Sequence, residues 1–341
     1  MSSMKERVTA SWALSYELVW REIIFHHQMT SSSSQSAADL PQIPEPVLQD
    51  GLSYWEKQSV SYDGVLGGYG SGALPRVESL GSRTFLLYLF PELSTVPSAV
   101  RPLKPPPARR FRALDVGAGI GRVTSDTLLP LVSDVVLLEP IESLIQAALS
   151  KGRASATEAH STNESRLPLQ KRKWKGIADG SKSVTFLQGT LQDCDPANPT
   201  RTATLLGRVG YTPPSPDDES GFDVVWCQWC LIYMKDTDLI AFLKRSQAAL
   251  RKEGPGVIVV KDNVCQDGEG GVPEILFDEK DSSVTRYFSS FALPLEGLKM
   301  SSRSDLYWKM IFRNAGLSLL HERVQYGLPK GLYMVKMYAL K

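Results

Sequence analysis

The chain has 341 residues, of which 42% are hydrophobic and 22% charged, a composition ordinary for a soluble globular protein with a sizeable core. Its formal net charge of +1 provides no long-range field that would attract nucleic acid or an anionic membrane surface. The sequence has no uninterrupted apolar run of about 18 residues, so a membrane-spanning helix is not expected.

Residues 1–45 are predicted to form a flexible extension. Charged side chains interrupt the apolar residues of its first part, so a short amphipathic helix fits better than the core of a signal peptide. The serine run Ser31–Ser34 and the proline-rich stretch Pro41–Pro46 are typical of segments that do not pack into a core. We expect one α/β domain over residues 46–341.

The central part of the chain alternates short apolar runs with segments typical of helices. Helices are expected at Ile141–Leu149 and Asp236–Leu250. The expected strands are Phe111–Val116, Val135–Leu138, Val184–Leu187, Phe222–Trp229 and Val257–Val260. This alternation predicts a parallel sheet that helices cover on both faces.

The C-terminal part predicts how this sheet ends. A helix is expected at Ser304–Ala315, followed by two strand candidates, Leu317–Val324 and Leu332–Ala339. Parallel strands followed by a helix and a closing antiparallel hairpin are the layout of class I methyltransferases, a Rossmann-like α/β fold. A dinucleotide dehydrogenase usually continues with another parallel strand and a substrate domain.

Three segments are predicted to be surface insertions. Residues 151–180 are rich in Ser, Lys, Arg and Thr, residues 195–220 contain five prolines, and residues 267–271 read Asp-Gly-Glu-Gly-Gly. The basic run Lys171–Lys175 could contact RNA or serve as a nuclear signal, but a solvated loop is the preferred interpretation.

The cysteines and histidines predict neither a disulfide framework nor a metal site. Cys227 and Cys230 have the spacing of a redox pair, but they end a predicted buried strand, so structural thiols are preferred. His26 and His27 lie in the extension, which leaves no usual zinc-ligand spacing. We expect reduced thiols and a cytoplasmic or nuclear protein.

A glycine-rich sequence, Leu114–Arg122, follows the first predicted strand. Glycines such as Gly117 and Gly119 let the backbone turn tightly and approach a ligand closely. Glu139 ends the next strand, about 20 residues on, where it could accept hydrogen bonds from both ribose hydroxyls of an adenosine nucleoside. The glycine pattern alone is weak, because NAD is bound by the same device.

Other polar residues favour S-adenosylmethionine over NAD. Asp115, Thr190–Asp193 and Gln228 could surround adenine and a zwitterionic methionine without offering a pyrophosphate clamp. Arg122 could pair with the methionine carboxylate through its planar fork. The alternative roles are a surface salt bridge for Arg122 and a solvated loop carboxylate for Glu139.

Several motifs resemble those of the protein α-N-terminal methyltransferases, which act on Xaa-Pro-Lys termini. These motifs are Val65–Gly70, Ala113–Thr124, Trp226–Trp229, Val260–Asn263 and Asp281–Arg286. The resemblance runs from near Tyr54 to the C-terminus, apart from the three insertions. It implies S-adenosylmethionine as cofactor, S-adenosylhomocysteine as product, and protein N-terminal peptides of the Xaa-Pro-Lys or Xaa-Pro-Arg type as partners.

The resemblance also implies two sets of site residues. The cofactor would be held by Gly117, Gly119, Arg122, Glu139, Leu191, Gln192 and Gln228. The acceptor pocket would use Tyr54, Trp55, Leu66, Trp229, Asn263, Asp278, Asp281, Ser283 and Tyr333.

These residue types suit methyl transfer to an amine. An α-amino group has a pKa of about 7.7–8.0, against about 10.4 for lysine, so it is the easier amine to present neutral. Asp281 is the candidate to accept its proton or stabilise the ammonium, and Asn263 would orient the terminal residue. Trp229 offers a flat wall for a second-position proline, while Asp278 and Ser283 could receive the third side chain.

One position departs from the family pattern. Many members carry a histidine on the loop after the fourth strand, where this chain has Tyr233. A tyrosine of pKa about 10 is a poor base, so we expect it to position the amine, with reduced activity as the alternative. Two other functions stay open: a small-molecule methyltransferase, and a methyltransferase-like regulatory subunit without turnover.

Overall fold

The computed structural model describes most of the chain from Glu45 onward. The ranges described are 45–96, 102, 109–157, 167–214, 221–267, 275–276, 302–330 and 332–341. Residues 1–44 lie outside them, so the N-terminal extension and the domain boundary stay predictions. Within these ranges no helix has the length and apolar character needed to cross a bilayer.

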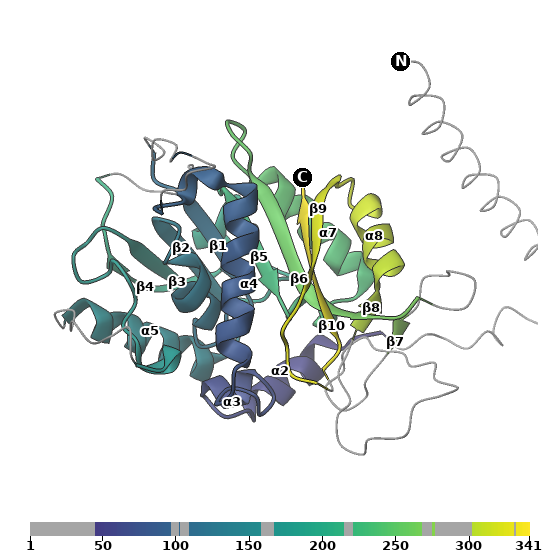
Figure 1. The fold of residues 1–341 in the computed structure, drawn as a ribbon, viewed down its shortest axis with the longest axis horizontal. Helices are drawn as coiled ribbons and strands as arrows, with labels where there is room; N and C mark the ends of the chain where they lie inside the picture. The colour runs from purple at the N-terminus through teal and green to yellow at the C-terminus, as the bar shows by residue number, and fades with distance from the viewer. Residues whose placement is uncertain are drawn as a thin grey trace, which may run out of the picture. The chain divides into compact units, whose positions relative to one another are not determined.

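A mixed sheet of ten strands runs through the described part of the chain, in the order β4-β3-β2-β1-β5-β6-β10-β9 (Figure 1). Five of these strands are mutually parallel and confirm the predicted runs. They are β1 (Arg112–Val116), β2 (Asp134–Glu139), β3 (Ser183–Gln188), β5 (Val224–Gln228) and β6 (Val257–Cys265). They are almost entirely buried, which is why they appear in the sequence as continuous apolar runs.

An antiparallel hairpin closes the sheet, as predicted. The strand β10 (Met334–Leu340) pairs with β6, and β9 (Leu319–Gln325) pairs with β10. Two short strands, β7 (Ile275–Leu276) and β8 (Ser302–Ser304), pair with each other, and β8 also pairs with the end of β6.

Helices cover both faces of the sheet. On one face lie α4 (Leu74–Leu89) and α5 (Glu142–Thr157), and on the other α7 (Asp236–Ala248) and α8 (Asp305–Asn314). Alternate residues of β6 contact the two layers, since Val259 packs in the α4 and α5 cluster and Val260 in the α7 and α8 cluster. Two further helices, α2 (Leu48–Glu56) and α3 (Tyr62–Val65), precede α4.

The segment 195–220 was predicted to be an inserted loop, but its described part, residues 195–214, is not wholly a loop. It contains α6 (Pro199–Thr202) and β4 (Thr204–Gly210), and β4 pairs antiparallel with β3 as an edge strand of the sheet. The prediction was wrong because the prolines flank this strand rather than interrupt it. An edge strand also needs one partner only, and it keeps exposed apolar side chains such as Leu205.

The segment 151–180 is only partly a loop. Its first residues extend α5 to Thr157, beyond the predicted end at Leu149. Within the basic run, Trp174 is fully buried and stacks on Phe186 of β3 with ring centroids 5.8 Å apart. The run is therefore anchored to the core instead of being wholly solvated. Residues 158–166, and 268–271 of the third predicted insertion, lie outside the described residues.

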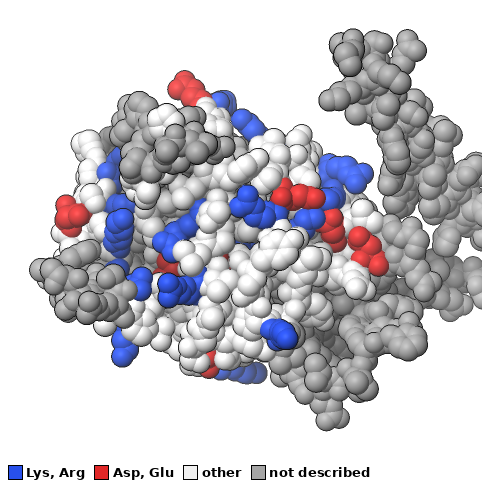
Figure 2. Space-filling model, viewed as in Figure 1, with Lys and Arg blue, Asp and Glu red and all other residues white. Residues whose placement is uncertain are grey.

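Figure 2 shows the face that α4 crosses. Lys and Arg side chains occupy separate groups on it, and acidic side chains lie beside basic ones toward the β9 side. In an ion network beside α8, Lys309 and Lys336 both pair with Asp305 and Glu322.

Candidate active site

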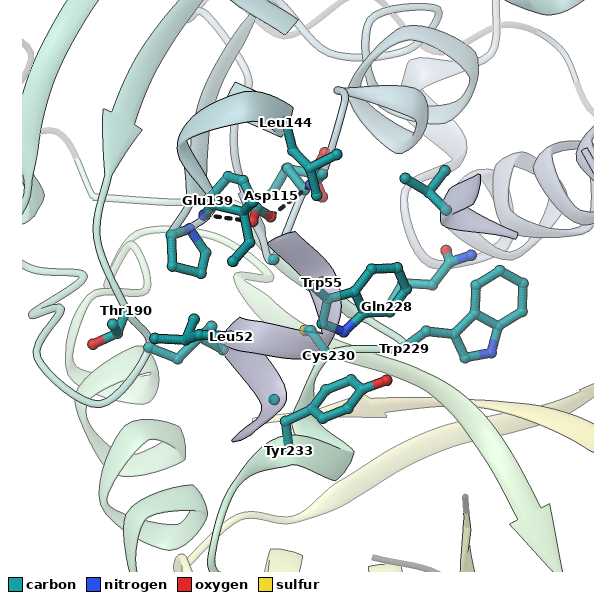
Figure 3. A pocket seen from close by; sticks show the side chains of 18 of the residues that line it. Leu52, Trp55, Asp115, Glu139, Leu144, Thr190, Gln228, Trp229, Cys230 and Tyr233 are labelled. Atoms are coloured by element: carbon teal, nitrogen blue, oxygen red, sulfur yellow. Dashed lines mark hydrogen bonds between the residues drawn. The ribbon is translucent and has the colours of Figure 1, made fainter. Parts of the chain in front are cut away.

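A cavity lies at the carboxyl ends of β1, β2 and β5, where ligands bind in open α/β sheets (Figure 3). Its lining includes all of the predicted cofactor residues: Gly117, Gly119, Arg122, Glu139, Leu191, Gln192 and Gln228. Two of the predicted acceptor residues, Trp55 and Trp229, line the same cavity, as does Tyr233, which was predicted to position the amine. In Figure 3 these three lie toward one end, and Asp115 and Glu139 toward the other.

The glycine loop adopts backbone angles that glycine alone adopts easily. The φ angles of Gly117, Gly119 and Gly121 are +60°, +57° and +75°. A Cβ atom on Gly117 would lie 2.5 Å from Cβ of Cys230, so a side chain there would collide with the neighbouring cavity wall. The loop is thus a cradle that a Cβ would partly fill.

Glu139 is a buried carboxylate that the backbone holds in place. Its Oε2 accepts a hydrogen bond from the N–H of Gly119 at 2.8 Å, and its Oε1 accepts one from Ile141 at 2.9 Å. Burial raises the pKa of Glu139 to about 7, although these two hydrogen bonds oppose the shift. Each carboxylate oxygen keeps a further lone pair that could accept from a ligand hydroxyl. A solvated loop role for Glu139 is wrong, because only 4% of the residue is exposed.

Asp115 is also buried at this end of the cavity. Its Oδ2 accepts a hydrogen bond of 2.6 Å from the Thr124 hydroxyl. Burial raises the pKa of Asp115 to about 7, against the opposing effect of Thr124. The cavity therefore has two carboxyl groups that titrate near neutrality.

Arg122 is neither a free side chain nor part of a surface salt bridge. It lines the cavity, yet its guanidinium forms a buried ion pair with Glu78 of α4. The same carboxylate accepts hydrogen bonds from Gln228 and from Lys261, each at 2.9 Å. We did not identify Glu78 as a site residue from the sequence. It stands four residues before Ser82 and seven before Phe85, a spacing that places it on the apolar side of a possible helix.

Trp229 connects the two ends of the cavity. The guanidinium of Arg122 lies 5.6 Å from the centroid of the Trp229 indole ring. The indole N–H of Trp229 donates to Oδ1 of Asn263 at 3.2 Å. The φ of Trp229 is +55°, and among the described residues no other non-glycine residue has a positive φ. A strained backbone at such a position is typical of a functional site.

The helix α2 covers the end of the cavity that holds Tyr233, one of the predicted acceptor-side residues, with aromatic side chains. Trp55 meets Tyr54 and Tyr233 edge to face, with ring centroids 5.5 Å and 6.0 Å apart. Gly51 lies against Tyr233, so that a Cβ on Gly51 would be 3.4 Å from Cδ1 of the tyrosine. Sequence reasoning assigned no role to Leu48, Gly51 or Leu52, which also line the cavity.

The other predicted acceptor residues are less directly placed. Leu66 is buried next to Val65, which lines the cavity, and Tyr333 precedes β10, whose Val335 pairs with Asn263. Asp278, Asp281 and Ser283 lie outside the described residues. Among those that are described, no cluster of His, Cys, Asp and Glu could hold a metal ion.

Asp262 lies between Lys261 and Asn263 and is fully buried. Its Oδ1 accepts from the N–H of Asn263 at 2.8 Å, while its Oδ2 has no hydrogen-bond partner. Burial raises the pKa of Asp262 to about 7.

Comparison with known proteins gives one consistent result. The family model of AdoMet-dependent proline di-methyltransferases matches residues 44–175 and 187–341. Alpha N-terminal protein methyltransferase 1 of Arabidopsis thaliana is 31% identical over 86% of this chain and 78% of its own length. The protein of that name from Schizosaccharomyces pombe is 32% identical over 87% of this chain and 97% of its own length.

A human relative and one solved structure agree. Human N-terminal Xaa-Pro-Lys N-methyltransferase 1 is 29% identical over 85% of this chain and 92% of its own length. A SAM-dependent methyltransferase of Leishmania major superposes with a TM-score of 0.55 at 26% identity, covering 86% of this chain and 82% of the other.

Proposed function

This chain belongs to the family of AdoMet-dependent proline di-methyltransferases, and from that premise we propose that it methylates the α-amino group of protein N-termini. The acceptors would begin with Xaa-Pro-Lys or Xaa-Pro-Arg after removal of the initiator methionine. The observation that carries the proposal is one cavity in which Trp229 lies next to the predicted cofactor residues. The indole N–H of Trp229 is hydrogen-bonded to Asn263. Names of relatives that act on Xaa-Pro-Lys termini support the substrate class.

The residues at the cofactor end fit S-adenosylmethionine. The glycine cradle admits a ligand against the backbone, Glu139 offers lone pairs to the ribose hydroxyls, and Arg122 offers guanidinium N–H groups to the methionine carboxylate. Leu191 and Gln192 would border the adenine. When bound, this cofactor supplies an electrophilic methyl group on a sulfonium.

The residues at the acceptor end would align an amine with that methyl group and exclude water, which is most of the task in such a displacement. Trp229 would face the second-position proline, and Asn263, fixed by the indole N–H, would bond the backbone of the terminal residue. The α2 aromatic residues Tyr54 and Trp55 would close the cavity over the peptide.

An α-ammonium must lose a proton before its nitrogen can attack. We assign that proton to Asp281, with Asp278 and Ser283 receiving the third side chain, by resemblance alone. Tyr233 lies against Gly51 and Trp55, where its hydroxyl would position the amine. A tyrosine of ordinary pKa, about 10, cannot serve as a base at neutral pH.

The test is mass spectrometry of Ser-Pro-Lys and Pro-Pro-Lys peptides after incubation with enzyme and S-adenosylmethionine. We expect mass gains of whole methyl groups on these peptides and none on N-acetylated copies, because acetylation blocks the α-amine. Methylation of the blocked peptide would contradict the α-amine assignment. Binding of cofactor without methylation of either peptide would favour a regulatory subunit or a small-molecule enzyme.

We also propose that the protein acts in the cytoplasm or nucleus and does not bind nucleic acid directly. The near-neutral net charge supports the second point. Fractionation of cells that express a tagged chain tests the location.

A further inference from the structure

A buried carboxylate of α4 lies directly behind the cofactor end of the cavity. Glu78 is 0% exposed, and its partners come from three other parts of the fold. Oε2 pairs with Arg122 of the glycine loop, while Oε1 accepts from Gln228 at the end of β5 and from Lys261 of β6. Two of these three partners line the cavity themselves.

Glu78 is held as an anion. Burial alone would raise its pKa, but Arg122 and Lys261 lower the pKa of Glu78 to about 2. Ser82, one helical turn along α4, donates to the carboxylate at 3.0 Å and accepts from Lys261 at 2.7 Å. Charged and neutral donors therefore satisfy both oxygens of the carboxylate, as a buried charge requires.

The carboxylate fixes which way the Gln228 amide faces. The Nε2 of Gln228 donates to Glu78, and its Oε1 accepts from the indole N–H of Trp226 at 3.1 Å. A flipped amide would set two acceptors against each other at Glu78 and two donors at Trp226. One orientation is therefore imposed, and it leaves one N–H of Gln228 for the cavity.

The carboxylate also fixes Arg122. Among the described residues Glu78 is the ion-pair partner of this arginine, whose other neighbour is the face of Trp229. Asp115 and Asp126 are close enough to affect the pKa of nearby groups, but they bond to Thr124 and to Tyr62 respectively. Lys261 shares the carboxylate, and Asp126 also acts electrostatically on Arg122 without an ion pair to it, so Glu78 is the group that fixes the position of the guanidinium.

We propose that Glu78 is a positioning residue of the cofactor site, which holds Arg122 and Gln228 in the orientations that receive the amino-acid end of the cofactor. The proposal rests on the proposed function for the identity of that ligand. It does not depend on which amine accepts the methyl group.

The test is Glu78→Gln, assayed by calorimetric titration with S-adenosylhomocysteine and by steady-state kinetics. An amide keeps the shape but cannot accept from Arg122 and Lys261 with both terminal atoms. We expect the Kd for S-adenosylhomocysteine and the KM for S-adenosylmethionine to rise about 10- to 100-fold. The kcat at saturating cofactor should stay within about threefold of the unmodified enzyme, because Glu78 does not touch the acceptor.

Asp223→Asn is the matched control. Asp223 is as buried as Glu78 and pairs with Arg251 at 2.7 Å, but it precedes the amino end of β5, whereas Gln228 lies at the carboxyl end. We expect a comparable loss of thermal stability and an unchanged Kd. This control separates a loss of stability from a loss of positioning.

A Glu78→Gln protein that folds and binds S-adenosylhomocysteine within twofold of the unmodified chain would overturn the proposal, as would a fall in kcat with unchanged KM. If Glu78→Gln does not fold, Glu78→Asp keeps the charge but withdraws the carboxylate by one methylene, and an unchanged Kd in that variant overturns the proposal equally. If Glu78→Gln loses cofactor affinity but the unmodified protein methylates no peptide, the role of Glu78 is supported. Only the proposal of an α-amine as methyl acceptor is then refuted.

Discussion

The two ends of the cavity are built in different ways. At the cofactor end, the groups stand on adjacent parallel strands and on the loops that directly follow them, and the backbone itself donates to Glu139. At the acceptor end, side chains from α2, the 3₁₀ turn Leu231–Tyr233 and β6 come together from distant parts of the sequence. The cofactor end therefore depends on local backbone geometry, and the acceptor end on how separate segments pack.

The largest effect should come from Gly117→Ala, which changes the glycine loop of the cofactor end. An alanine at this φ is strained by about 1–3 kcal/mol. Its Cβ would also lie only 2.5 Å from Cβ of Cys230. We expect calorimetric binding of S-adenosylhomocysteine to weaken by more than about 100-fold, equivalent to about 2.8 kcal/mol.

Gly180→Ala controls for backbone strain. Gly180 has a φ of +65°, and an added Cβ would meet nothing within 4 Å. This variant should lose stability but bind the cofactor product normally. Equal affinity in both variants would mean that the glycine loop does not form the cofactor cradle.

The proposed role of Asp281 as proton acceptor is tested by Asp281→Asn beside Tyr233→Phe. Loss of a general base typically costs 100-fold or more in rate. We therefore expect kcat for a Ser-Pro-Lys peptide to fall about 100-fold or more in Asp281→Asn and less than about fivefold in Tyr233→Phe. Full turnover in the first variant with no turnover in the second would reverse the roles.

Asn263→Ala should separate the two ends at smaller cost. Removal of its amide leaves the Trp229 indole N–H without its acceptor and takes a hydrogen bond from the peptide. One such bond is worth about 1.4 kcal/mol, so the KM for peptide should rise about tenfold while the Kd for S-adenosylhomocysteine is unchanged. Asn314→Ala, at an exposed helix end, is the control. A parallel loss of cofactor affinity would show that the two ends are not separable.

A further effect, on stability instead of activity, concerns pH. The folded-state pKa values of Asp115, Glu139 and Asp262 are each raised to about 7, above their ordinary values. The folded protein then binds more protons than the unfolded chain between about pH 4 and pH 7. The free energy of unfolding of the cofactor-free protein should therefore fall as pH rises through this window and level off above it.

Glu139→Gln removes one of these groups. The free energy of unfolding of this variant, minus that of the unmodified protein, should rise by roughly 2 kcal/mol from pH 5 to pH 8. Urea unfolding of both proteins measures this difference. Glu78 acts in the opposite direction, since its lowered pKa contributes stability that is lost as pH falls from about 4.5 toward 2. A difference between Glu139→Gln and the unmodified protein that does not change with pH would contradict an elevated Glu139 pKa.

The sequence was sufficient to predict the parallel strands, the closing hairpin and a set of residues that line one cavity beside the glycine loop. Each of these is a local pattern: a buried strand is a continuous apolar run, and a strand end followed by glycines is a ligand loop. The residues of the cofactor motif are also neighbours along the chain or at equivalent ends of adjacent strands. Their convergence follows from the sheet itself.

The helix α4 escaped prediction because its buried side is not uniformly apolar. Leu74, Phe85 and Leu86 have helical spacing, but Glu78 and the serines at 79 and 82 occupy the same buried side. Their burial follows from the ion network with Arg122 and Lys261, which is visible only when the helix is docked on the sheet. The strand β4 was missed for the related reason that its single partner, β3, determines its structure.

Trp229 has a consequence for how this protein would respond to substitution. An L-residue in the left-handed region costs about 1–2 kcal/mol, a cost that glycine avoids. Replacement by glycine would relieve this strain, but it would also remove the ring that Arg122 approaches and the indole N–H from which Asn263 accepts a hydrogen bond. The contacts of the indole therefore offset the backbone cost, and a Trp229→Gly variant should not gain heat resistance.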